Sequence, residues 1–197
     1  DLGVAFDEVL ICSGPASLNP DPLKRQRFDG FRSELISYAD FNSATFQMFA
    51  PGQQPRTGYN ELHNPSMGIA PDILFFENNA GYDFINTFQL NLVAGAGFKR
   101  NPNQNYNNII LNETSTKILG FKTPEEAIGR SIFRKGDDTT QLQIIGVLAD
   151  FHNEGLQKPI YPMVWNNYYP REFGYFAIRF NTKNMKGSIK QLKTIWD

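Results

Sequence analysis

Residues 142–165, with the sequence LQIIGVLADFHNEGLQKPIYPMVW, constrain the fold more than any other stretch of this chain. The first eight residues are mostly large, apolar or β-branched, which is typical of a buried β-strand. Asp150, Asn153 and Gly155 then supply turn-forming residues, and two prolines farther along favour an extended backbone. The stretch therefore predicts a buried strand, a loop and a second extended segment.

Three residues in this stretch predict how the strand and the loop pack. Gly146 lies inside the predicted strand, where a glycine indicates a β-bulge or the close approach of another backbone. Phe151 and Leu156 are apolar residues in an otherwise polar loop. We expect both side chains to anchor the loop to the core.

Charge and cysteine content exclude some classes of protein. The chain has 197 residues, a formal net charge of −1 and a pI of about 6.2, whereas a nucleic-acid-binding domain normally has a basic face. Cys12 is the only cysteine, so no intramolecular disulfide can form. We expect Cys12 to act as a small apolar residue at the end of a strand, and we expect no nucleic-acid partner.

The ends of the chain suggest a piece of a longer protein. No stretch approaches the roughly 20 apolar residues of a membrane-spanning helix, and the chain starts at Asp1 without a signal peptide. Met185, Ile189, Leu192 and Trp196 have the spacing of an amphipathic helix, and no glycine or proline ends it. We therefore expect the native polypeptide to continue beyond this helix.

A helix predicted over residues 22–37 carries a basic cluster. Asp21 is a suitable N-cap, and proline occupies the first helical position. The basic residues of this helix are Lys24, Arg25, Arg27 and Arg32. They form either a solvated helix face, which is our expectation, or a surface that docks a partner.

Two shorter helices have N-terminal signals. Asn112 follows a predicted strand at residues 109–111 and is expected to cap a helix that Gly120 ends. Thr123 and Glu126 have the spacing of a capping box. We expect two strands after this second helix, at residues 131–134 and 140–149, joined by a turn at residues 135–138.

The remaining elements follow from alternation, turn residues and caps. Strands are predicted at residues 6–12, 44–49, 69–77, 89–93 and 175–180, the last with clean alternation of buried and exposed residues. Asn79 is expected to cap a short helix that ends at Phe88. Residues 51–65 are rich in Gly, Pro, Asn and Gln, so we expect an exposed loop in which His63 is solvated.

Sequence motifs for enzyme chemistry are absent. The chain has no P-loop, C-x-x-C, H-E-x-x-H or G-x-S-x-G pattern. Gly95 and Gly97 begin a G-x-G pattern, but Arg100 stands where the third glycine of a dinucleotide loop belongs, so they predict a tight turn. We expect no catalytic residue, no bound cofactor and no bound metal.

Asp150, His152 and Glu154 are the best candidates for a metal site or for acid–base catalysis. Their spacing is not specific, and a metal would need further ligands from elsewhere in the chain. The alternative is a turn held by hydrogen bonds from side chains to the backbone, and this is the interpretation we favour.

Several motifs in a fixed order resemble the periplasmic core domain of MacB/FtsX-like ABC transporter permeases, in particular the bacteroidete-type members. The matching segments, which together span about residues 7–196, are 82–88 (YDFINTF), 92–95 (LVAG) with Phe98, 109–114 (IILNET), 118–121 (ILGF), 126–129 (EAIG), 145–147 (IGV), 150–152 (DFH) and Pro162. Two departures are Gly97, where arginine is common, and Gly155, where serine is frequent. No single motif is specific, so the resemblance depends on their common order.

The resemblance implies a mixed α+β fold with two lobes, built from short βαβ-type units and antiparallel strands. We expect one lobe at residues 1–95 plus 160–197 and an inserted lobe at residues 96–159. It also implies a non-catalytic domain on the periplasmic side of the inner membrane, between transmembrane helices that lie outside this chain. Its partners would be a cytoplasmic ABC ATPase, separate or fused, and a second permease copy. A periplasmic adaptor, or a lipoprotein or peptide substrate, would be engaged outside the membrane.

Three functional readings follow from these observations. The leading one is a permease domain that couples cytoplasmic ATP hydrolysis to the movement or export of a substrate outside the membrane. A stand-alone periplasmic ligand-binding or sensory domain is the alternative, because Asn and aromatic residues are common in the predicted loops. A small hydrolase that uses Asp150 and His152 is the third and least favoured reading.

Overall fold

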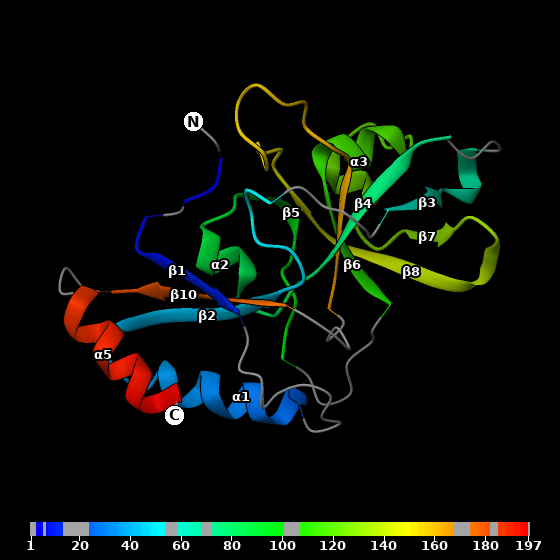
Figure 1. Cartoon of the computed structure of the whole chain (residues 1–197). Coiled ribbons are helices and arrows are strands. Elements are labelled where there is room, and N and C mark those ends of the chain that lie inside the picture. The colour runs from blue at the N-terminus through cyan, green and yellow to red at the C-terminus, as the bar shows by residue number, and fades with distance from the viewer. Residues whose placement is uncertain are drawn as a thin grey trace.

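The computed structural model describes residues 3–5, 7–13, 24–53, 59–67, 72–100, 107–167, 174–181 and 185–196. Within these ranges, helices and strands form a mixed α+β domain with two sheets (Figure 1). This confirms the predicted fold class. No helix in the described ranges combines the length and the apolar character needed to cross a membrane.

The smaller sheet has three antiparallel strands. Their order is β1 (Val9–Ser13), β10 (Tyr175–Phe180) and β2 (Phe41–Gln47). Helices α1 (Lys24–Leu35) and α5 (Met185–Trp196) lie side by side along one face, and α2 (Phe84–Phe88) lies against the other (Figure 1). Strand β10 is therefore covered on both faces.

Burial in β10 follows from this covering. Ile178 and Phe180 pack with residues of α1 and α5, whereas Ala177 packs on the opposite side with residues of α2. The strand was predicted at the correct residues, but the expected alternation of buried and exposed positions is wrong. All residues from Phe176 to Phe180 are buried, because helices cover both faces.

The larger sheet closes into a barrel. Its strands are β3 (Tyr59–His63), β4 (Leu74–Asn79), β5 (Leu92–Gly95), β6 (Asn108–Asn112), β7 (Ser131–Arg134), β8 (Asp137–Leu148) and β9 (Met163–Asn166). The order is β5-β8-β6-β9-β4-β3-β7, and β7 pairs again with β8. The long β8 therefore closes a ring of six strands, and β5 pairs with β8 outside that ring.

The barrel contains strands from both predicted lobes. Strands β3, β4 and β9 come from residues assigned to the lobe 1–95 plus 160–197. Of these, β3 pairs with β7 and β9 pairs with β6, and both partners belong to the predicted inserted lobe 96–159. Sheet membership and lobe division are different properties, so the lobe boundaries stay a prediction.

Apolar side chains fill the barrel. The inward-facing residues, none more than 2 % exposed, are Leu62, Phe75, Ile109, Leu111, Ile132, Leu142, Ile144 and Val164. Leu119, which follows α3 (Glu113–Ile118), and Ala127 of α4 (Pro124–Ala127) pack against this cluster. Removing such area from water contributes about 25 cal/mol per Å², so the barrel core is a main source of stability.

Trp165 connects the outside of the barrel to the rest of the domain. Its ring centroid lies 5.9 Å from that of Phe84 in α2 and 5.9 Å from that of Phe151. Phe151 is buried, which confirms that it anchors the loop after β8. The expectation for Leu156 is wrong, because this side chain is 62 % exposed.

Gly146 lies next to a β-bulge and also at a close approach of another backbone, the two features that a glycine in this strand indicated. Ile109 pairs with Ile144 and the next residue, Ile110, pairs with Gly146, so Ile145 is the extra residue of a bulge. A Cβ atom on Gly146 would lie 2.5 Å from the carbonyl oxygen of Ala96. Only glycine allows this approach of β8 to the turn after β5.

Both predicted N-caps in the region 112–126 are present. The side chain of Asn112 accepts a hydrogen bond from Ser115 N at 3.0 Å, and Thr123 accepts one from Glu126 N at 3.4 Å. The capping box differs in one detail, since Glu126 Oε2 accepts its hydrogen bond from Lys122 N instead of Thr123 N. Gly120 ends the first helix with a φ of 81°.

Other local predictions are wrong. Asn79 ends β4, and Asp83 occupies the N-cap position of α2. The expected loop over residues 51–65 contains β3, so His63 lies in a strand, where its ring stacks on Phe133 at 5.8 Å between centroids. Cross-strand pairing overrides the turn-rich composition there.

The turn between β7 and β8 is shorter than predicted. It consists of Lys135 and Gly136, and β8 begins at Asp137 instead of residue 140. Asp137 Oδ1 accepts hydrogen bonds from Thr139 Oγ1 at 2.7 Å and from the Thr139 and Thr140 amides at 3.1 Å. These bonds stabilise the carboxylate, so the pKa of Asp137 falls from its usual 3.8 to about 2.

A pH titration tests this turn. Because the folded-state pKa of Asp137 is depressed, its contribution to stability is present above the unfolded-state value and is lost as pH falls through about 2. We expect carboxyl NMR signals to report that value, and Asp137→Asn to remove the contribution at neutral pH. An Asp137 carboxyl that titrates near 3.8 would contradict these hydrogen bonds.

The segment before β1 is held by a buried arginine. Arg179 of β10 is 5 % exposed and donates from Nε to Thr87 O at 2.6 Å, from Nη1 to Asp7 O at 3.0 Å and from Nη2 to Ala5 O at 2.9 Å. Burial lowers the pKa of Arg179, an effect that the nearby Glu8 and Asp7 oppose. One guanidinium thus fastens the N-terminal segment and α2 to the small sheet.

Candidate functional site

The carboxylate of Asp150 is used to hold the backbone in place. Its Oδ1 accepts from Thr114 N and Asn112 Nδ2, both at 2.9 Å, and its Oδ2 accepts from Thr114 Oγ1 at 2.8 Å. In return, Asp150 N donates to Glu113 Oε2 at 3.1 Å. Asp150 is thus fixed at the start of α3, which agrees with the interpretation that hydrogen bonds hold this turn.

Asn112 completes this junction. Its Oδ1 accepts from Ser115 N and from Met163 N, and its Nδ2 donates to Asp150 Oδ1 and to Tyr161 O, with distances of 2.9–3.0 Å. An asparagine side chain can make four such bonds, and all four are made here in a residue that is 1 % exposed. We call these contacts the Asn112–Asp150 junction. It ties together β6, α3, the loop after β8 and the start of β9.

The other proposed site residues do not join Asp150. His152 Nδ1 lies 3.3 Å from Lys158 O. Across the described residues, no three His, Cys, Asp or Glu side chains cluster as metal ligands. Asp150, His152 and Glu154 are therefore not brought together as one metal-binding group.

Two further predictions concern single residues. Cys12 lies near the end of β1, half-buried against the cluster of Phe28, Phe46 and Phe176, and burial raises the pKa of its thiol. Arg32, expected on a solvated face, instead pairs with Asp83 and so joins α1 to α2. The side chains of Lys24 and Arg25 lie outside the described residues.

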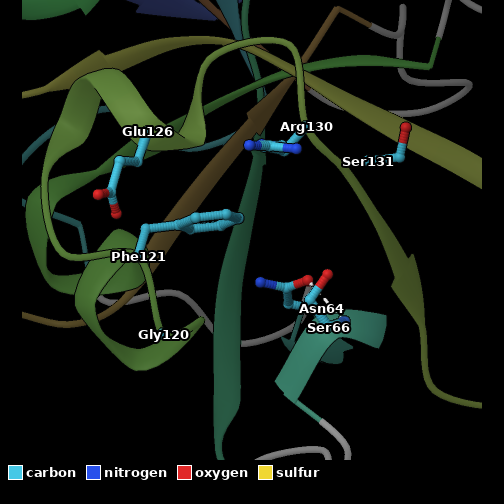
Figure 2. A pocket seen from close by; sticks show the side chains of 7 residues that line it. All are labelled: Asn64, Ser66, Gly120, Phe121, Glu126, Arg130 and Ser131. Carbon is cyan, nitrogen blue, oxygen red and sulfur yellow. Dashed lines mark hydrogen bonds between the residues drawn. The ribbon is translucent and has the colours of Figure 1, made fainter.

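A polar pocket of about 480 Å³ lies beside the barrel. It is lined by Asn64, Ser66, Gly120, Phe121, Glu126, Arg130 and Ser131. Figure 2 shows these residues around one opening, with Glu126 and Ser131 on opposite sides of the view and Arg130 and Phe121 between them. Asn64 follows β3 and Ser66 lies in the short helix η2 (Pro65–Met67). The other residues lie in the α3–α4 turn, in α4, and at the passage from α4 into β7.

Contacts among its walls form this pocket in advance. Asn64 Nδ2 donates to Leu119 O and Asn64 Oδ1 accepts from Ser66 N, both at 3.0 Å. A Cβ atom on Gly120 would lie 2.7 Å from Met67 Sδ, so the α3–α4 turn lies close against η2. The capping bond between Glu126 and Lys122 N holds the third wall.

The sequence indicated parts of this pocket without locating it. The glycine that ends α3 and the capping box of α4 were both recognised, and they bracket Phe121. Nothing in the sequence signalled Asn64 or Ser66, because η2 reaches the pocket only through the fold of the barrel. Arg130 follows a turn glycine, Gly129, but a single arginine after a turn is not a specific signal.

Comparison with models of known protein families finds no match, and comparison with curated proteins finds none. Solved structures do match. The periplasmic region of MacB from Actinobacillus actinomycetemcomitans aligns with a TM-score of 0.59 and 14 % identity, over 98 % of this chain and 84 % of that chain. A domain described as part of a permease protein from Porphyromonas gingivalis aligns with a TM-score of 0.57 and 12 % identity, over 97 % and 85 %.

Because the sequence identities are low, these two structural matches establish the fold of the chain alone. Both alignments include nearly the whole chain, so the match extends to the small sheet and the barrel together. The resemblance inferred from the ordered motifs is thereby confirmed at the level of structure, and the chain has the α+β fold of the MacB periplasmic region.

Proposed function

We propose that this chain is a non-catalytic, extracytoplasmic domain of an ABC transporter permease of the MacB/FtsX type. The observation that carries the proposal is the structural match along 98 % of the chain to a MacB periplasmic region. In the proposed protein, transmembrane helices flank the domain, and a cytoplasmic ATPase and a second permease copy complete the transporter.

The role we propose is to pass motion from the membrane helices to a substrate or adaptor outside the membrane. Two features support it. The barrel is closed by hydrogen-bonded strands on every side, which favours movement as one rigid piece. The segment before β1 is fastened to β10 and α2 through Arg179, so displacement of that segment would be passed to both.

Cysteine labelling of the full-length protein in its native bacterium tests this location. In a Cys12→Ser background, Leu156→Cys supplies a thiol at a side chain that is 62 % exposed. We expect a membrane-impermeant maleimide to label it once the outer membrane is permeabilised and while the inner membrane is intact.

Two controls make the labelling interpretable. The Cys12→Ser protein alone gives the background labelling, and Ala127→Cys, at a position that is 0 % exposed, should rise above that background only after unfolding. Labelling of Leu156→Cys only after lysis of the inner membrane would place the domain in the cytoplasm and refute the proposal.

A further inference from the structure

Arg130 has a fixed backbone and a side chain that is available for a ligand. Its carbonyl oxygen accepts from Ile144 N at 2.9 Å, its amide donates to Ala127 O at 3.1 Å, and Gly129 N donates to Ile144 O at 2.8 Å. Its exposed guanidinium has no carboxylate partner among the described residues, unlike those of Arg32 and Arg134. A positioned guanidinium that lines a pocket is suited to bind a carboxylate.

The second charge in the pocket restricts the ligand. Glu126 lines the same opening, and its Oε2 is held by Lys122 N. A carboxylate in the wall repels a ligand with two negative charges, such as phosphate, and attracts an ammonium group. The pocket therefore offers Arg130 to an anionic group of the ligand and Glu126 to a cationic group of the ligand.

The other walls suit a small polar molecule. The hydroxyl groups of Ser66 and Ser131 can exchange hydrogen bonds with amide groups of a ligand, and the half-buried Phe121 ring offers an apolar surface. A volume of about 480 Å³ lies within the range of pockets that hold small ligands. Because the walls already contact one another, little order has to be gained on binding.

We infer that this pocket binds a zwitterionic amino acid or short peptide, with the ligand carboxylate at Arg130 and its ammonium at Glu126. The inference goes beyond the proposed function and does not rest on it. A binding pocket on the barrel would exist whether or not the domain belongs to a permease.

Titration of the ¹⁵N-labelled chain with triglycine tests the inference. At millimolar peptide we expect saturable shifts of the backbone amide signals of Phe121, Arg130 and Ser131, with signals of α1 unchanged. N-acetyltriglycine lacks the ammonium and triglycinamide lacks the carboxylate, so each should bind roughly tenfold or more weakly, as expected for loss of one charge-assisted contact.

Variants assign each subsite to its residue. Arg130→Gln should weaken triglycine roughly tenfold or more and leave triglycinamide unaffected. Glu126→Gln retains an oxygen that can accept from Lys122 N, and should weaken triglycine while leaving N-acetyltriglycine unaffected. Lys117→Gln also removes one positive charge, but at an exposed position outside the pocket. This control variant should bind triglycine like the unmodified chain.

Three results would overturn the inference. The first is no saturable shift with millimolar triglycine. The second is equal binding of triglycine and both blocked peptides, which needs no variant and so does not depend on how the variants fold. The third is inorganic phosphate that binds as tightly as triglycine, which would make Arg130 a general anion site.

Discussion

Asn112→Asp is expected to lower the free energy of unfolding at pH 7 by about 3–4 kcal/mol, although it changes only one nitrogen to oxygen. The new carboxylate can still accept from Ser115 N and Met163 N, so the cap of α3 remains. It cannot donate to Tyr161 O or Asp150, and it would face the Asp150 carboxylate where the amide lay 2.9 Å away. Urea unfolding at pH 7 measures the loss.

The pH dependence of this variant separates charge repulsion from a simple packing defect. Two facing carboxylates raise the pKa of one of them, and a protonated carboxyl can donate a hydrogen bond to the other. The loss in stability should therefore shrink as pH falls towards 4. Asn91→Asp adds the same charge at an exposed position and should change stability by less than about 0.5 kcal/mol. An equal loss at pH 4 and pH 7 would contradict the proposed repulsion.

Arg179→Met is expected to cost about 3–5 kcal/mol of unfolding free energy, because it leaves three carbonyl oxygens without their charged donor. The methionine keeps much of the aliphatic volume, so the loss reports the hydrogen bonds more than the packing. Hydrogen exchange should be fastest, relative to the unmodified chain, in the described residues before β1.

Two companion variants make the Arg179 result specific. Arg179→Lys keeps the charge, but one ammonium cannot span acceptors on α2 and on the N-terminal segment, so a loss of roughly 2 kcal/mol should persist. Lys193→Met removes a charge from the exposed side of α5 and should leave stability nearly unchanged. If Arg179→Met left exchange before β1 unaffected, Arg179 would not hold that segment.

Local signals predicted the parts of this structure that depend on neighbours in sequence. Asn112 and Thr123 cap their helices as expected, because an N-cap needs only an acceptor side chain and an amide three residues later. Gly146 was informative for the same reason, since a glycine within an apolar strand leaves few explanations. These features fix where elements begin, end or bend.

Contacts between distant residues could not be predicted in this way. Asn112 and Asp150 were each recognised as a cap or turn residue, yet nothing in the sequence showed that their side chains bind one another across 38 positions. The burial of Arg179 is not predictable from its sequence context, because an arginine in a strand is usually solvated and this one is covered by α2. Leu156 was misplaced because apolar character alone does not show whether a loop side chain faces the core.

The pairing of β1 with β10 sets the order in which the domain can assemble. Every barrel strand lies between residues 59 and 166, so the barrel can close as soon as that part of the chain is available. Strand β1 can pair only after β10 is available, because Val9 pairs with Arg179 near the opposite end of the chain. A chain that ends before β10 would keep a complete barrel but leave two strands, β1 and β2, without their strand partner, and such unpaired edges can pair with other chains.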